Sequence, residues 1–222
     1  VLVPTLVPGC NTHEIGDIIR TAVKWYPTVR GVHFQPVSYF GRHPGSKDNH
    51  LRLTLPELMQ LIEKQTNGML KTDHFRPPGC EHSLCSFSAQ YLISEAGNLI
   101  PMHPDPTSWK NQGPIKAEKG AARAIGSVAR QWASASKPGN SCSCRKGPEW
   151  NDPSQPISLD DFLNLAQNRA FSVSAMAFQD VWNIDLERVQ QCCIHVMAID
   201  GRLIPFCLYN LTAEDGRSLY RP

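Results

Sequence analysis

The stretch that decides the fold is "VLVPTLVPGCNTHEIGDIIRTAVKWY" at residues 1–26. Its first eight residues are largely apolar and β-branched, which is typical of a strand covered on both faces. Apolar residues then recur at helical spacing from Ile15 onward, and Pro27 follows, so the pattern predicts a helix. Asn11 and Glu14 stand at the spacing of a capping box at the start of that helix.

The same alternation continues along the chain. "VRGVHFQPVSYF" at residues 29–40 predicts a second strand, and "TLPELMQLIEKQT" at residues 54–66 predicts a second helix. Thr54 and Glu57 are spaced as a capping box at the start of this helix. Strand, helix, strand and helix joined by short links are typical of βαβ units and a parallel sheet. We therefore expect an α/β fold, with functional groups at the carboxyl ends of the strands.

Two hairpins are predicted further along the chain. "AQYLISEAGNLIPM" at residues 89–102 turns at Gly97, and "CCIHVMAIDGRLIPFCLYN" at residues 192–210 turns at Gly201. Both contain Gly-x-Leu-Ile-Pro, and both are preceded by cysteine. The shared pattern favours two related hairpins that cradle a cluster, although one pentapeptide match can arise by coincidence.

The region between the hairpins has a different composition. Residues 105–156 are rich in Pro, Gly, Ser, Ala and Lys, which predicts a flexible linker or insertion, crossed by one helix at 117–133. "SLDDFLNLAQNRAF" at residues 158–171 predicts another helix. We expect four parts. A barrel-like part spans 1–76, and a first Cys-bearing loop and hairpin spans 77–104. The linker spans 105–156, and a helix with the C-terminal Cys-bearing hairpin spans 157–222.

Composition limits the classes of partner and the compartment. The 222 residues carry a net charge of +2, so the balance implies neither nucleic acid nor a membrane surface as a partner. No apolar run is long enough to span a bilayer, and the chain is expected to be cytoplasmic. The chain starts without Met inside an apolar strand, so we expect a further N-terminal portion.

Eight cysteines are more than packing alone suggests. Cys80 and Cys85 flank a short loop after Pro-Pro-Gly, and Cys207 leaves the second hairpin. Cys192 and Cys193 enter that hairpin, and adjacent residues of a strand face opposite sides, so one of the two is expected to be a ligand, with Cys193 favoured. We predict that Cys80, Cys85, Cys193 and Cys207 converge on one metal centre, zinc or iron–sulfur. The alternative is two unrelated pairs of buried thiols.

The remaining candidate residues have open assignments. Cys142 and Cys144, in "SCSCRKG", are a second metal site, a redox pair or residues without such a role. Cys10 is either a reactive thiol near a helix start or an ordinary turn residue. His82 lies inside the Cys80–Cys85 loop and either replaces a thiolate or faces solvent. No Gly-x-Gly-x-x-Gly, Walker loop, His-Glu-x-x-His or nucleophile elbow occurs in the sequence.

Several stretches resemble a known superfamily. "LVPTLVPGCNTHEIGDIIRTA" and "VRGVHFQPVSYFGR" resemble the last strand–helix units of a radical S-adenosylmethionine (radical SAM) barrel. "PPGCEHSLCSFSAQYLI" and the segment from "FSVSAMAF" to "CLYN" resemble the C-terminal part of the radical SAM (seleno)proteins TrsS, which are related to the tetraether lipid synthase group. The resemblance covers most of the chain outside residues 105–156.

The resemblance implies the C-terminal βα units of a partial (β/α) barrel, with a Cys-rich hairpin extension. It also implies an auxiliary [4Fe–4S] cluster at the four cysteines named above, and chemistry that starts with a 5′-deoxyadenosyl radical. The Cys-x-x-x-Cys-x-x-Cys motif of the catalytic cluster is absent from residues 1–222. The resemblance therefore implies that this cluster and most of the S-adenosylmethionine site lie in an N-terminal portion, and that this chain is not active alone.

Further expectations follow from the resemblance. Gln35 and Asn11, at the strand ends, are expected to face the adenosyl group, and a satisfied core glutamine is the alternative for Gln35. A reductant protein is an expected partner, and the substrate is an unidentified small or lipid-like molecule. The competing function is a zinc-stabilised binding module without catalysis.

Overall fold

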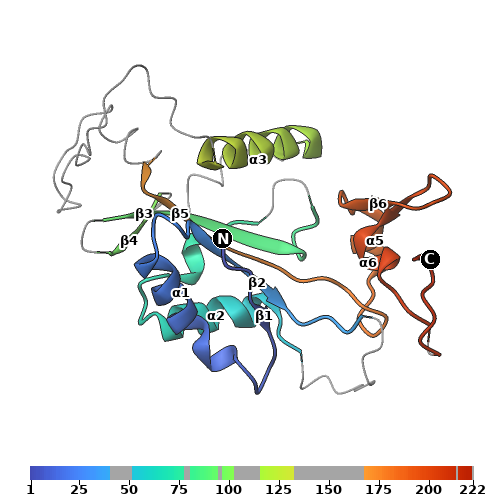
Figure 1. Ribbon diagram of the computed structural model, residues 1–222, viewed down its shortest axis with the longest axis horizontal. Coiled ribbons are helices and arrows are strands. Elements are labelled where there is room, and N and C mark those ends of the chain that lie inside the picture. The colour runs from blue at the N-terminus through green and yellow to red at the C-terminus, as the bar shows by residue number, and fades with distance from the viewer. Residues whose placement is uncertain are drawn as a thin grey trace.

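The computed structural model describes most of the chain outside the central insertion. The described residues are 1–40, 52–77, 81–94, 97–102, 116–132, 168–213 and 215–221. Figure 1 shows a central sheet with α1 and α2 on one face, α3 on the other side, and the C-terminal elements beside one end of the sheet. The strands are β1 Thr5–Leu6, β2 Gly31–Pro36, β3 Ser86–Ile93, β4 Leu99–Pro101, β5 Ala170–Met176, β6 His195–Met197 and β7 Leu203–Pro205. The α-helices are α1 Ile15–Lys24, α2 Leu55–Gln65, α3 Ala117–Trp132, α5 Leu186–Gln190 and α6 Phe206–Tyr209.

The expected α/β fold is confirmed, but the sheet is mixed rather than parallel. Its order is β1-β2-β5-β3-β4. β1, β2 and β5 run parallel, whereas β3 is antiparallel to both β5 and β4. β1, α1 and β2 form the predicted βαβ unit, and the next strand beside β2 comes from much later in the chain. One sheet thus joins strands from three of the parts expected from the sequence.

β5 replaces the end of a helix predicted from the sequence. Residues 158–167 of that predicted helix lie outside the described part of the chain, but Ala170 and Phe171 belong to β5 and not to a helix. The segment "AFSVSAM" alternates buried and half-exposed side chains, which is the period of a strand. Because β2 and β3 flank it on both sides, β5 is the central strand of the sheet.

The alternating pattern gives the sheet one apolar face and one polar face. On the face covered by α1 and α2, Val32 and Phe34 of β2 lie in register with Val173 and Ala175 of β5, and all four are buried. The helices complete this core with side chains spaced three or four residues apart, which are Ile15, Ile19, Ala22, Leu55, Leu58 and Ile62. The polar face is described with the functional site.

The first strand is shorter and more exposed than its apolar sequence suggested. Only Thr5–Leu6 pairs as a strand, with one further bridge from Leu2 to Val32. Val1 and Val3 are exposed, whereas Leu6 is buried, so β1 is covered on one face only. This follows from its position at the edge of the sheet, beside β2 alone.

One of the two predicted capping boxes forms. The Thr54 hydroxyl accepts from Glu57 N at 3.3 Å, and the Glu57 carboxylate accepts from Thr54 N at 3.2 Å, so α2 starts as predicted. Asn11 makes no such cap. Its side chain instead accepts from Val7 N and donates to the Thr5 carbonyl, both at 2.8 Å, so it fixes the turn after β1.

Both predicted hairpins are present and share one construction. Ile93 pairs with Leu99 across the first turn, and Met197 pairs with Leu203 across the second. Gly97 and Gly201 both have φ near +80°, which a side chain would strain, so the shared glycine is required by the turn. The predicted helix at 117–133 is confirmed as α3, and the rest of residues 105–156 lies outside the described residues, apart from Lys116.

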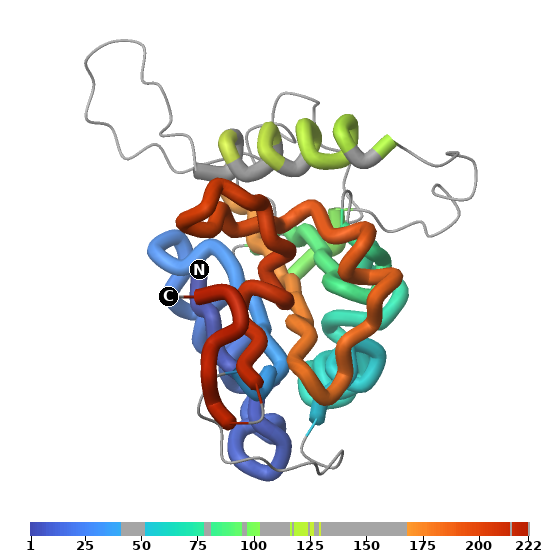
Figure 2. The backbone as a smooth tube through the Cα atoms, turned by 90° about the vertical axis from the view of Figure 1, so that its right-hand side faces the viewer, coloured from blue at the N-terminus to red at the C-terminus, as the bar shows by residue number. Residues whose placement is uncertain are grey.

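Figure 2 shows the C-terminal segment in front of the sheet, with α3 across the top. No helix in the described part of the chain is both long and apolar enough to cross a membrane.

A Gly31→Ala substitution is expected to destabilise the fold by about 1–3 kcal/mol. A Cβ atom at this position would lie 2.3 Å from Ser172 Oγ and 2.6 Å from the Ser172 carbonyl oxygen, so β2 and β5 would have to separate locally. Urea unfolding measures the effect. The control is Ser88→Ala on the exposed surface of β3, which should change stability by less than about 0.5 kcal/mol. An unchanged midpoint for Gly31→Ala would contradict the close approach of these strands.

Candidate functional site at the junction of the sheet and the C-terminal hairpin

Cys85 is held at the junction between the loop before β3 and the segment after β5. Its backbone N donates to the His82 carbonyl at 2.8 Å, and its carbonyl accepts from Ala177 N at 2.9 Å. The Arg188 guanidinium, from α5, donates to Cys85 Sγ at 3.4 Å and to the Ala177 carbonyl at 3.1 Å. Arg188 therefore ties α5 to both segments.

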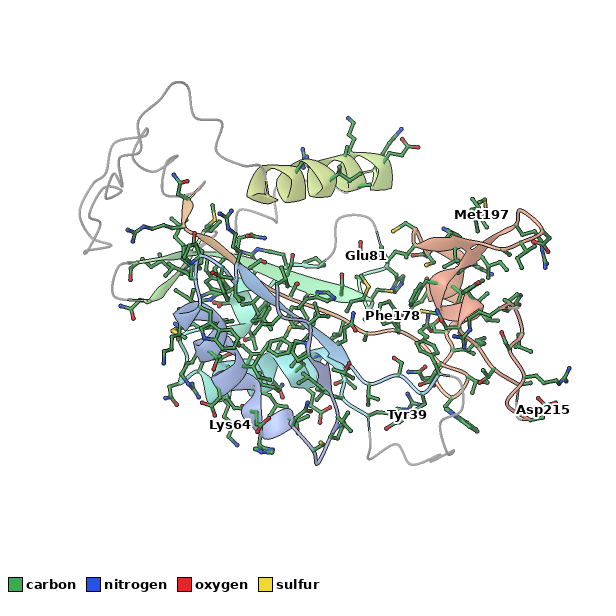
Figure 3. The ribbon with its side chains drawn as sticks, viewed as in Figure 1. Tyr39, Lys64, Glu81, Phe178, Met197 and Asp215 are labelled. Atoms are coloured by element: carbon green, nitrogen blue, oxygen red, sulfur yellow. The ribbon has the colours of Figure 1, made fainter. Side chains whose placement is uncertain are left out.

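Cys207 approaches the same segment from the other side. It lies in α6, immediately after the C-terminal hairpin, and its Sγ accepts from Gln179 N at 3.3 Å. The rings of Phe178 and Phe206 pack with centroids 4.8 Å apart, which fixes α6 against the segment after β5. Figure 3 shows Phe178 and Glu81 between the sheet and the C-terminal elements. Residues 177–179 thus form a shared support for both cysteines.

The electrostatics of Cys207 identify its neighbours. Burial raises the pKa of the Cys207 thiol, and the Gln179 N–H opposes this shift. Smaller effects on the same pKa come from Cys192 and Cys85, which raise it, and from Arg188, which lowers it. The Cys192 thiol also donates to the Ile194 carbonyl at 3.1 Å. Cys85, Cys192 and Arg188 are therefore the ionisable neighbours whose electrostatic effects reach Cys207.

The described residues include three of the four cysteines predicted as ligands, and Cys80 lies outside them. Cys85 and Cys207 both adjoin residues 177–179, through the Ala177 N–H and the Gln179 N–H. Cys193 is exposed, whereas Cys192 is half-buried. Within the described residues, no group of three or more Cys, His, Asp or Glu side chains is close enough to hold a metal ion.

The other candidate residues are placed as follows. Cys10 is exposed in the turn after β1, and Cys142 and Cys144 lie outside the described part of the chain. His82 Nδ1 accepts from Leu84 N at 3.2 Å and so shapes the loop before Cys85. Gln35 is half-buried on the polar face of the sheet. The side-chain amide of Asn11 is engaged by the β1 turn on both its oxygen and its nitrogen.

A polar row on the sheet was missed by the sequence analysis. His33 of β2, Ser174 of β5 and Ser88 of β3 lie in register across three strands, on the face opposite α1 and α2. His33 Nδ1 and Ser174 Oγ are hydrogen-bonded at 2.9 Å. The alternation of "VHFQ" and "SVSA" is the signal that could have indicated it, since every second residue of each run is polar.

Stability is expected to fall with decreasing pH partly because of His33. Burial lowers the pKa of His33 below its ordinary value near 6.5, so the folded state favours the neutral ring. The unfolded chain takes up this proton first, and the contribution is therefore present above about pH 6.5 and lost as the pH falls below it. Urea unfolding of His33→Asn between pH 7 and pH 5 should show a weaker pH dependence than the unsubstituted protein. His74, whose pKa burial also lowers, is common to both proteins. Equal pH dependence would contradict the role of His33.

A cavity of about 390 Å³ adjoins the cysteines. Its walls come from the end of β2, the start of α2, the loop before β3 and the segment after β5. Ser83, Leu84 and Ser86, which flank Cys85 in sequence, line it together with Arg188. The cavity and the thiols therefore share a wall, at the C-terminal end of the parallel strands where ligands of α/β proteins bind.

A buried ion pair holds this wall in place. The Arg52 guanidinium donates two hydrogen bonds of 2.9 Å to the two carboxylate oxygens of Asp180, which also accepts from Tyr39 N and Trp182 N at 2.8 and 3.0 Å. Asp180 has no exposed side-chain surface, and Arg52 is 16% exposed. Neither residue was singled out from the sequence, because a lone Arg and a lone Asp that are far apart in the chain form no motif.

No protein-family profile matches this chain. The chain is 32% identical, over an alignment of 246 residues, to the 7,8-dihydro-6-hydroxymethylpterin dimethyltransferase of Methanocaldococcus jannaschii. The match covers 95% of this chain and 47% of the relative, so the chain spans about half the length of the curated relative it matches. Most of this chain is thus similar to part of a larger dimethyltransferase.

Proposed function

We propose that this chain is the C-terminal portion of a radical SAM enzyme, where it contributes part of the active-site wall and binds an auxiliary iron–sulfur cluster. The observation that supports the proposal best is that Cys85 and Cys207, which lie far apart in the sequence, are both hydrogen-bonded to residues 177–179. Thiolates are the ligands that iron–sulfur clusters require, so the chemistry of the donors fits.

The proposed ligands are Cys85, Cys207, one thiol from the hairpin and Cys80. Cys192 is preferred to Cys193 for the hairpin thiol because it is half-buried and acts on Cys207. Cys80 is proposed from its place in the sequence. When bound, the cluster would supply electron transfer or a contact to substrate. The Gln179 N–H and the Arg188 guanidinium would donate hydrogen bonds to the sulfur atoms, which partly offset the charge of a thiolate-bound cluster.

The reaction class follows from the relative. Its name is that of a dimethyltransferase acting on 7,8-dihydro-6-hydroxymethylpterin, so methyl transfer to a small organic molecule is the reaction to test first. S-adenosylmethionine would be bound mostly by a portion outside these 222 residues, with Gln35 near the adenosyl group. The role of Asn11 would be to fix the turn at the end of β1, since both ends of its amide bind the backbone there.

Anaerobic loading of the purified chain with ferrous iron and sulfide tests the proposal. The expected product is brown, absorbs broadly in the thiolate–iron region, and contains iron and sulfide in equal amounts. A zinc-stabilised module would instead give a colourless protein that retains one zinc ion and takes up no sulfide. That result would reject the iron–sulfur assignment.

A further inference from the structure

The cavity beside the cysteines has the properties of a binding site for a small molecule. We propose that it binds an apolar molecule that presents a carbonyl or carboxylate oxygen to Arg188, and that Arg188 couples this ligand to Cys85. The inference deepens the proposed function, because it names the class of molecule held beside the proposed cluster, and it rests on that function for the role of the thiols.

The size and the apolar lining of the cavity fit a ligand that is largely apolar. Its volume of about 390 Å³ lies within the range of small-molecule sites, which is roughly 300–1,000 Å³. Pro36 and Val37 form one wall, Leu55 and Met59 of α2 form another, and Phe178 closes a third side. Such walls bind through the removal of apolar surface from water, which is proportional to area and does not select a single chemical group.

Two of the polar groups on these walls are already engaged. The start of α2 is capped by its own Glu57, so its backbone N–H groups do not form an open anion site. Arg52 is held by both oxygens of Asp180. Arg188 is the remaining charged residue on these walls, and Ser83, Ser86 and Asn183 add uncharged polar groups.

Arg188 has an unused donor. One of its terminal nitrogens binds Cys85 Sγ and the Ala177 carbonyl, whereas its Nε is buried and has no hydrogen-bond partner among the described residues. Because Nε has almost no accessible surface, a ligand in the cavity would reach Arg188 through other atoms of its guanidinium, where a positively charged donor binds an oxygen strongly. Carbonyl and carboxylate oxygens match the planar donor geometry of a guanidinium.

The same side chain connects the ligand to sulfur. A ligand oxygen bound to the guanidinium would hold it in its present position, with a terminal nitrogen 3.4 Å from Cys85 Sγ. A guanidinium fixed in this position would shield the Cys85 sulfur and limit the access of an alkylating reagent. Occupation of the cavity should therefore slow the modification of Cys85, although the ligand need not touch the thiol.

Isothermal titration of the metal-free chain tests binding, with decanoate and 7,8-dihydro-6-hydroxymethylpterin as separate probes. Both present an acceptor oxygen, but only decanoate has an apolar body, because the pterin ring carries several polar nitrogens. Decanoate is expected to bind with a dissociation constant below about 1 mM, and more tightly than the pterin. Met59→Trp, which fills the cavity, and Arg188→Gln should each weaken this binding at least about tenfold. The matched control is Arg202→Gln in the C-terminal hairpin, where Arg202 pairs with Asp200 in solvent, and it should bind as the unsubstituted chain does.

The second readout is the rate at which iodoacetamide alkylates Cys85, followed by peptide mass spectrometry. A saturating probe should slow this rate at least about threefold in the unsubstituted chain and leave it unchanged in Arg188→Gln. Circular dichroism confirms that each variant is folded. The proposal is overturned if decanoate does not bind, if either cavity variant binds it as the unsubstituted chain does, or if the alkylation rate of Cys85 does not change when the probe is bound. These measurements need no metal, so a failure of cluster assembly leaves them interpretable.

Discussion

Replacing Asp180 by alanine is expected to lower the free energy of unfolding by about 3–5 kcal/mol. The carboxylate accepts two hydrogen bonds from Arg52 and one each from the Tyr39 and Trp182 backbone nitrogens, and it is completely buried. Its removal leaves a largely buried guanidinium without a counter-charge, together with backbone donors that have lost their acceptor. Since domains are stable by only about 5–15 kcal/mol, this is a large fraction of the total.

Urea unfolding followed by circular dichroism measures this loss. The matched control is Asp200→Ala, which removes an aspartate from a solvent-exposed pair with Arg202, and it should change stability little. Asp180 differs from Asp200 in burial and in accepting hydrogen bonds from three other residues, so the comparison measures these two differences together. Equal effects of the two substitutions would contradict the assigned role of Asp180.

A double substitution separates the charge from the contacts. Arg52→Met combined with Asp180→Ala removes the guanidinium that Asp180→Ala alone leaves without a counter-charge. The double substitution should therefore be less destabilising than Asp180→Ala alone. Some loss should remain, because the Tyr39 and Trp182 nitrogens still lack an acceptor and because Arg52 no longer packs on the Tyr39 ring, 4.9 Å from its centroid. A double variant that is less stable than the single one would mean that Arg52 stabilises the fold without Asp180.

Local sequence patterns predicted the elements whose structure depends on neighbours in the chain. The βαβ unit from β1 to β2, α2 with its capping box, and both hairpins are present because helical spacing, capping and turn chemistry act over a few residues. The shared Gly-x-Leu-Ile-Pro pattern indicated two hairpins of the same construction, and the positive φ of Gly97 and Gly201 explains the shared glycine.

Long-range pairing explains what was missed. "FSVSAM" was joined to the preceding helical pattern, although it is the central strand of the sheet. Its partners β2 and β3 lie far earlier in the chain, and alternation cannot say where in a sheet a strand inserts. The antiparallel direction of β3 also depends on this long-range pairing, so local sequence patterns do not predict it.

The residues of the candidate site also fall into two groups, those that the local sequence indicated and those that it did not. Cys85 and Cys207 could be singled out because cysteines beside turns are rare and recognisable. Arg188, Gln179 and Asp180 could not, because their importance depends on which distant group each one meets. The choice between Cys192 and Cys193 also required coordinates, since adjacent residues have the same sequence context.

The second large effect is expected for Cys207→Ser in the iron-loaded chain. The substitution replaces a sulfur ligand by a hydroxyl of similar shape, which is a poor ligand for an iron–sulfur cluster. Substitution of groups that only support a ligand already costs about 10–100-fold in metal affinity, so the loss of a ligand should cost at least tenfold. Iron and sulfide content after anaerobic loading and desalting, together with the visible spectrum, measure the loss.

The controls use the other thiols of this chain. Cys10→Ser changes an exposed thiol in the turn after β1 and should retain the full iron and sulfide content. Cys192→Ser should lose iron as Cys207→Ser does, whereas Cys193→Ser should not, because Cys192 is the half-buried thiol that acts on Cys207. The opposite result for this adjacent pair would keep the cluster but transfer the ligand to Cys193. Full iron and sulfide in folded Cys207→Ser would instead reject a cluster at this junction, because Cys207 is one of its proposed ligands.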